Sequence, residues 1–184
     1  FMKLEIIPEA LNRLKNPPKE LNFIGDTSLL SMPKVAVVGS RKASVYTKEC
    51  VTALCAALKN ANVCVVSGGA IGVDITAHKA AMPRTIGVFA NGLDIIYPAQ
   101  NRASIKEIYE KGLALSEYDD GEPPIAYRFL ERNRIVVGLA QALVVAQADL
   151  RSGSMQSARL ANELKIPLFV LPQRINESSG TNAL

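Results

Sequence analysis

Short apolar, β-branched runs alternate with longer stretches of helical pattern after residue 34, and this alternation is the strongest constraint on the fold. The apolar runs predict strands at 35–38, 63–66, 86–89, 113–116, 142–146 and 167–171. The intervening stretches predict helices at 45–59, 72–82, 102–111, 129–140 and 154–164. Strands and helices in this order build a parallel sheet that is covered by helices. We therefore expect an α/β fold with a Rossmann-like, doubly wound, mostly parallel sheet and helices on both faces.

The first 34 residues do not follow this strand and helix pattern, because Pro8, Pro17 and Pro18 interrupt them before the first predicted strand. We expect residues 1–34 to form an N-terminal lead-in that packs on the main domain. Residues 35–184 are then expected to form a single Rossmann-like domain, since 184 residues suffice for one substantial core.

Composition and motif counts argue against a metal-binding, membrane-spanning or secreted protein. Lys and Arg outnumber Asp and Glu by 21 to 17, a mild excess that favours a polyanionic partner only if it is focused on one surface. The three cysteines match no zinc or redox spacing, and the single histidine is too few for a usual zinc shell, so we expect no metal site. No apolar run reaches the roughly 18 residues of a membrane span, and no signal-peptide core is present. We expect a cytoplasmic protein without a membrane partner.

Three loops that follow predicted strands are rich in small residues and hydrogen-bond donors. Ligands of open parallel sheets bind beyond the carboxyl ends of the strands, where glycines and helix N-termini admit anions. The candidate nucleic-acid-binding residues in these loops belong to "GSRK", "SGGAIGVD" and "LRSGSMQS", and they are Gly39, Ser40, Arg41, Lys42, Gly68, Gly69, Ser152, Gly153 and Ser154.

The sequence lacks residues that two kinds of nucleotide-binding site and one kind of catalytic site require. A dinucleotide fingerprint needs glycines where Arg41 and Ser44 stand, and no Walker Gly-Lys-Ser/Thr tripeptide occurs. We therefore expect no cofactor. Asp74 and His78 are four residues apart and could meet on one helical face, but no nucleophile elbow accompanies them. We interpret them as a structural pair that fixes a loop, and we expect no catalytic residues.

The segment "RFLERNRIVVGLA" places arginines beside a helix start. If that helix begins near Phe129, Arg132 and Arg134 lie close to its positive end, where cations are unfavourable unless an anion is near. The alternative is that Glu131 or another acid neutralises both arginines. Phe129 is either a core residue or a base-stacking platform.

The sequence resembles the DNA-processing protein A family, also called Smf, over almost its whole length. The motifs "VVGSRKAS", "VVSGGAIGVDITAH", "TIGVFANGLDIIYPAQN", "LSEY", "FLERNRIVVGLA", "ADLRSGSMQSARLA" and "LFVLPQRINESSGTNAL" follow the family's order. By resemblance, Ser40 and Arg41 match its Gly-Ser/Thr-Arg turn, and Arg132, Asn133 and Arg134 match its Arg-Asn-Arg segment. Leu130 and Glu131 stand where members commonly carry proline.

The resemblance implies a Rossmann-like homodimer that binds single-stranded DNA, protects incoming DNA and helps to load the RecA recombinase during natural transformation. Many members continue into a small C-terminal winged-helix-like domain, which we expect to be absent here. Phosphates of a single strand would follow the basic groove, and its bases would stack on aromatic rings or pack on arginine.

Two other classes remain open at this point. A nucleotide-processing enzyme similar to phosphoribohydrolases would need a "PGGxGT" loop followed by an acid, where this chain has "RSGSMQSA". An interaction scaffold would leave the donor-rich loops without a ligand.

Overall fold

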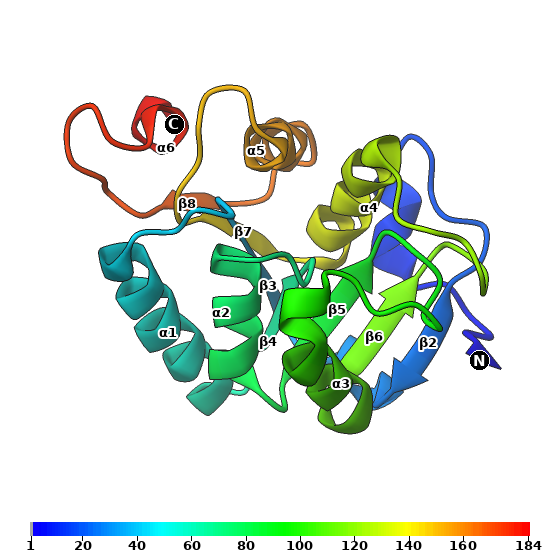
Figure 1. Ribbon diagram of the computed structural model, residues 1–184. Coiled ribbons are helices and arrows are strands. Elements are labelled where there is room, and N and C mark those ends of the chain that lie inside the picture. Colours follow the sequence, from blue (N-terminus) through cyan, green and yellow to red (C-terminus); the bar gives the residue numbers. More distant parts are fainter. Residues whose placement is uncertain (1) are drawn as a thin grey trace.

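The computed structural model describes residues 2–184 and contains one eight-stranded sheet with the order β1-β2-β6-β5-β4-β3-β7-β8 (Figure 1). Strands β3 to β8 pair in parallel, whereas β1 and β2 are antiparallel to their neighbours. The expected Rossmann-like, mostly parallel sheet is confirmed. The strands are β1 (Met2–Lys3), β2 (Asn22–Gly25), β3 (Lys34–Val38), β4 (Cys64–Ser67), β5 (Thr85–Phe89), β6 (Leu113–Ser116), β7 (Ala142–Val145) and β8 (Leu168–Val170).

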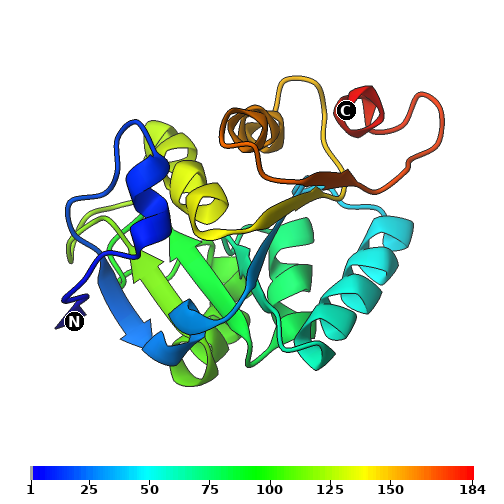
Figure 2. The same cartoon turned by 180° about the vertical axis from the view of Figure 1, so that it is seen from behind.

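Helices cover both faces of the sheet, as Figures 1 and 2 show from opposite sides. One face carries α1 (Val45–Asn60), α2 (Val73–Ala81) and α3 (Arg102–Lys111), and the other carries α4 (Ala126–Leu139) and α5 (Gly153–Glu163). The short helices are η1 (Glu9–Arg13), η2 (Thr27–Ser31), η3 (Ala99–Asn101) and the terminal α6 (Ser179–Ala183). Within residues 2–184, no helix combines the length and apolarity that a bilayer span requires.

The central strands explain why the sequence predicts them well. Every residue of β4, β5 and β6 is buried, because helices cover both faces of the sheet. These strands therefore appear in the sequence as short, mainly apolar runs. Side-chain caps mark the starts of two of the described α-helices: Ser44 accepts from the Thr47 amide before α1, and Ser152 accepts from the Met155 amide at α5.

The N-terminal segment contributes strands that the sequence pattern does not predict. β2 extends the sheet beyond β6, with Phe23 opposite Leu115, and β1 pairs with β2. Leu11 and Leu14 are buried in the same core cluster as α4. The signal is weak because β2 has only four residues and carries Asn22 and a terminal glycine.

Helix α4 begins at Ala126, three residues before the expected start at Phe129. Its N-cap is Ile125, which makes no side-chain capping bond, so the usual start signal is missing from the sequence. The longer helix places Arg132 in its second turn. The expectation that Arg132 lies near the positive end of the helix is therefore wrong.

Candidate functional site

The carboxyl ends of β3, β4 and β7 open onto a cavity of about 520 Å³ that lies between these strands and the first turns of α4 and α5. Asp149 and Ser157, which the sequence analysis did not single out, also line it. The cavity brings together most of the predicted nucleic-acid-binding residues: Gly39, Ser40, Arg41, Gly68, Phe129, Arg132, Asn133, Ser152, Gly153 and Ser154. Lys42, Gly69 and Arg134 are not part of its wall.

The loop after β3 uses its backbone donors internally. The Ser40 amide donates to the Gln147 carbonyl at 2.7 Å, and the Lys42 amide donates to Ser40 Oγ at 3.0 Å. The Ser44 amide donates to Gln147 Oε1 at 3.0 Å. This loop is thus held against the loop after β7, and the amides of Ser40, Lys42 and Ser44 are already used within the protein.

Arg41 is the exposed cation at the rim of the cavity. Its guanidinium carbon lies 5.6 Å from the centroid of the Phe129 ring, within the range of cation–π attraction. Phe129 is half-buried and is therefore neither a pure core residue nor a free platform. Lys42 is exposed beside Arg41 on the same loop.

The loop after β4 is closed by a carboxylate from its own helix. Asp74 Oδ2 accepts from the Gly68 amide at 3.1 Å and from the Ala70 amide at 3.5 Å. Gly69 has φ +70°, and a Cβ atom added there would lie 2.7 Å from the Phe89 ring, so this glycine serves close packing. Asp74 therefore already accepts from two of the amides that this loop was expected to offer to a phosphate.

Arg132 is a buried structural cation. Its Nη1 donates to the carbonyls of Gly68 at 2.7 Å and Val88 at 2.9 Å, and its Nε donates to Asn133 Oδ1 at 3.1 Å. Burial raises the pKa of Asp74 and lowers the pKa of Arg132, and the opposite charge of each partner opposes both shifts. Through the Gly68 amide and the Gly68 and Val88 carbonyls, Asp74 and Arg132 connect α2 and α4 to the ends of β4 and β5 at the cavity wall.

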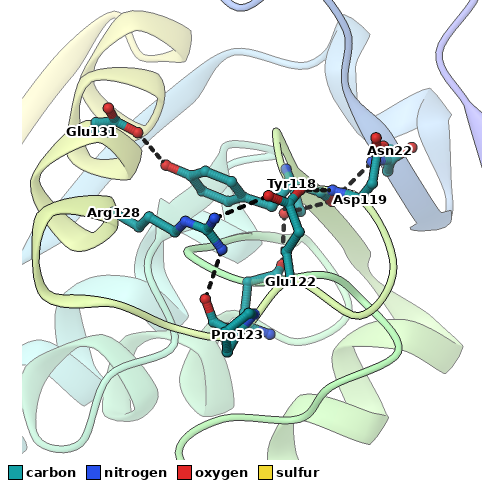
Figure 3. A network of polar contacts seen from close by, with 9 residues as sticks. Asn22, Tyr118, Asp119, Glu122, Pro123, Arg128 and Glu131 are labelled. Carbon is teal, nitrogen blue, oxygen red and sulfur yellow. Dashed lines mark hydrogen bonds and ion pairs between the residues drawn. The ribbon is translucent and has the colours of Figure 1, made fainter.

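Figure 3 shows a second network that attaches the first turns of α4 to the loop after β6. Arg128 donates to Glu122 Oε1 at 2.9 Å and to the Pro123 carbonyl at 2.8 Å, and it lies 4.6 Å from the Tyr118 ring centroid. The Tyr118 hydroxyl donates to Glu131 Oε2 at 2.5 Å. These contacts hold the early turns of α4, from which Phe129 reaches the cavity.

The N-terminus of α5 retains donors that face the cavity. The amides of Gly153 and Ser154 belong to the first helical turn, where no intrahelical acceptor exists. Ser157 is only 2% exposed, and its buried Oγ has no partner within residues 2–184. Asn133 Nδ2 lies opposite, since a methyl group added at Gly153 would approach it to 3.1 Å. Of the three predicted loops, the one after β7 therefore has the donor arrangement best suited to an anion.

Arg134 lies away from these residues. Its guanidinium pairs with Glu117 at 2.7 and 2.8 Å, and its Nε donates to the Asn16 carbonyl at 2.9 Å. The alternative in which an acid neutralises this arginine is the one observed, although the acid is Glu117 and not Glu131.

Charged residues beside α5 were missed by sequence reasoning. Arg151 and Arg159 line a hollow that adjoins the α5 N-terminus and shares Leu130, Ser152 and Gly153 with the cavity wall. Arg151 directly precedes the Ser152 cap, so the order Arg-Ser-Gly-Ser was a usable signal.

Asp74 and His78 are structural, but they do not form the expected pair. His78 Nδ1 hydrogen-bonds Thr85 Oγ1 at 2.6 Å, while Asp74 bonds the β4–α2 turn. Burial lowers the pKa of His78 to about 3, with a further contribution from the Arg132 charge. Among the described residues, no group of three or more His, Cys, Asp or Glu side chains is placed to hold a metal ion.

The family profile of DNA recombination-mediator protein A matches residues 2–184. The chain belongs to this family. Among its curated relatives, DNA processing protein DprA of Streptococcus pneumoniae is 40% identical over 91% of this chain and 60% of its own length. Protein Smf of a Synechocystis species is 37% identical over 94% of this chain and 46% of its own length. The chain thus spans about half of the length of these relatives.

Solved structures of family members superpose closely on this fold. DNA processing protein A of Helicobacter pylori, solved in a study of its single-stranded DNA binding mode, gives a TM-score of 0.98 at 50% identity, covering all of this chain and 86% of that one. DprA of S. pneumoniae gives 0.94 at 37% identity, covering all of this chain and 68% of that one. A molybdenum cofactor carrier protein from Chlamydomonas reinhardtii, at 19% identity and a TM-score of 0.52, shares the fold alone.

Proposed function

We propose that this chain binds single-stranded DNA along the carboxyl edge of its sheet. The observation that carries the proposal is the α5 N-terminus, where the Gly153 and Ser154 amides and the unpartnered Ser157 Oγ face a cavity whose rim carries Arg41. A backbone phosphate fits these donors, and the adjoining base fits the Arg41–Phe129 side of the cavity. The H. pylori relative, whose structure was determined for its single-stranded DNA binding mode, supports the choice of ligand.

The predicted residues divide into two roles in this proposal. The residues that meet DNA are Gly39, Ser40, Arg41, Lys42, Phe129, Asn133, Ser152, Gly153 and Ser154. Gly68 and Arg132 line the wall and hold its turns, because their polar groups are already used within the protein, and Gly69 packs closely against Phe89 outside the wall. Arg134 supports the outer side of α4 through Glu117.

Membership of the recombination-mediator family supports a wider role for the whole protein. We propose that it acts in the cytoplasm as a homodimer, protects incoming single-stranded DNA and helps to load RecA during natural transformation and recombination. Two copies would engage one strand with increased avidity. These statements concern the whole protein, whereas the chain spans about half of the length of its curated relatives.

A competition assay tests the DNA proposal. Fluorescence anisotropy with a labelled oligo(dT) should show displacement by unlabelled single strands of any sequence and much weaker displacement by duplex, because no base-reading helix motif is present. Equal competition by duplex, or no binding of the single strand, would contradict the proposal.

A nucleotide-processing enzyme on the same fold is the competing outcome. The structure gives it little support, since Asp74 already accepts from the Gly68 and Ala70 amides, which leaves Asp149 as the other carboxylate on the cavity. We expect no base release from AMP and no cleavage of oligonucleotides, with or without added divalent metal. Turnover that disappears in His78→Ala, with the fold intact by circular dichroism, would overturn this part.

A further inference from the structure

Beside the cavity lies a small hollow at the carboxyl end of β5. Arg41, Gly68, Phe129 and Arg132 line both spaces, so the two are adjacent compartments of one edge. Among the residues that line the hollow but not the cavity is Tyr97, whose ring centroid lies 6.0 Å from that of Phe129 at an interplanar angle of 50°. Tyr97 is 41% exposed, so its ring is accessible to a ligand at this edge.

The loop that carries Tyr97 is firmly anchored. Asn91 is buried and donates from Nδ2 to the Ile95 carbonyl at 2.6 Å, and its own carbonyl accepts from Ser116 Oγ at 2.7 Å. On the other side of the tyrosine, the buried Asn101 donates to the Gly69 carbonyl at 2.9 Å. An exposed ring on an anchored loop loses little conformational entropy when a ligand covers it.

The surroundings of Tyr97 differ from those of two other exposed tyrosines. The Tyr46 hydroxyl hydrogen-bonds the Pro172 carbonyl, and the Tyr127 ring lies 5.9 Å from the Arg128 guanidinium. Tyr97 has no hydrogen bond from its hydroxyl within residues 2–184 and faces the binding edge. Its neighbour Phe129 is less open, since the Arg41 and Arg132 guanidinium carbons each lie 5.6 Å from its ring centroid.

We propose that Tyr97 is a base-stacking residue, so that a single strand that passes Arg41 places one base against Phe129 and the next base on Tyr97. This inference rests on the proposed DNA-binding function and gives the strand a direction, from the α5 N-terminus towards the loop after β5. Every base has a stackable face, so the contact adds affinity without sequence preference.

Substitution of the tyrosine ring is the first test. Binding of oligo(dT) to Tyr97→Ala should weaken by roughly 5- to 150-fold in Kd, the range for loss of one base–aromatic stack. Tyr97→Phe keeps the ring and should bind within about twofold of wild type, as should the matched surface control Tyr46→Ala. If wild type binds and Tyr97→Ala binds equally well, the inference fails while the proposed function stands. If wild type does not bind, the proposed function itself fails.

Photocrosslinking of the unaltered chain is the second test, and it does not depend on a variant that folds. A 12-nucleotide oligo(dT) with one 5-iodouracil, moved one position at a time, should crosslink to Tyr97 and to Phe129 from adjacent nucleotide positions, as mapped by mass spectrometry. Adducts on Phe129 without any on Tyr97 would overturn the inference. An abasic nucleotide at the position that reaches Tyr97 should weaken wild-type binding but leave Tyr97→Ala unchanged, and equal weakening of both proteins would also overturn it.

Discussion

The N-termini of α2 and α5 open on the same edge of the sheet, follow similar glycine-containing loops and differ in one respect. At α2, Asp74 accepts from the Gly68 and Ala70 amides, and its charge lies beside the buried Arg132. At α5, the Ser152 hydroxyl caps one amide, while the amides of Gly153 and Ser154 face the cavity.

The difference shows that a small-residue loop before a helix is an anion site only when its donors are not already used. At the α2 end, the Gly68 and Ala70 amides are already bound by Asp74, whose charge is balanced by the nearby buried Arg132. Only the α5 end combines open amides with an unpartnered buried hydroxyl, Ser157 Oγ, within the described residues. Substitutions should therefore affect stability at α2 and DNA affinity at α5.

The largest expected effect is on the α2 side. Arg132→Met removes the buried guanidinium that donates to the Gly68 and Val88 carbonyls and whose charge favours the ionised form of the buried Asp74. It should lower the free energy of unfolding by about 3–5 kcal/mol, as measured by urea denaturation. Arg41→Met removes an exposed charge and should stay within about 0.5 kcal/mol of wild type. A stable Arg132→Met protein with a weakened salt dependence of DNA binding would mean that Arg132 meets a phosphate.

The next largest effect should be on the pH dependence of stability, through the buried His78 of α2. The folded pKa of His78 is lowered to about 3, against roughly 6.5 in an unfolded chain, so below pH 6.5 the unfolded state binds a proton that the folded state excludes. The stabilising contribution is complete above pH 6.5 and is lost by up to about 1.4 kcal/mol per pH unit as the pH falls towards 3. His78→Gln should show a shallower fall of unfolding free energy between pH 6.5 and 4.5 in urea melts; parallel curves would contradict the buried, neutral histidine.

A matched pair of glycine substitutions sharpens the comparison further. A methyl group at Gly68 would lie 2.6 Å from Arg132 Cζ and 2.9 Å from Asp74 Oδ2, so Gly68→Ala should cost about 1–3 kcal/mol of stability. At Gly153 the nearest atom is Asn133 Nδ2 at 3.1 Å, the end of a side chain that can move. Gly153→Ala should change stability by less than about 1 kcal/mol. Thermal melts of the two variants measure this difference. Equal losses of stability would show that the two helix ends are equally tightly packed.

The smallest expected effects separate charge from neutral donors at the open site. Arg41→Ala should reduce the slope of log Kd against log salt by about 0.7, the value for one single-strand phosphate contact. Ser154→Ala should weaken binding by about 0.5–1.5 kcal/mol with its slope parallel to wild type, because a hydroxyl releases no counterion. A titration of the three proteins side by side gives both values. If Arg41→Ala keeps the wild-type slope, Arg41 does not contact a phosphate.

The strand and helix pattern was predictable because both faces of the parallel strands are buried, so β4 to β6 are predominantly apolar in the sequence. The start of α4 was not predictable, since Ile125 makes no side-chain capping hydrogen bond and the first turn is held by tertiary contacts of Arg128. β2 escaped prediction for a similar reason: its four residues become a strand only through pairing with β6, far along the chain.

The candidate site follows the same division. The sequence by itself determined the family motifs and their place after strands, which puts Ser40, Gly68 and Ser152 at one sheet edge. Only the tertiary structure decided which donors remain for a ligand and that Arg132 is buried while Arg41 is exposed. Many of the deciding partners are distant in sequence, as when the Gln147 carbonyl accepts from the Ser40 amide and Arg132 donates to the Gly68 carbonyl. Hydrogen-bond saturation is a property of neighbours in space, and no local pattern of residues encodes it.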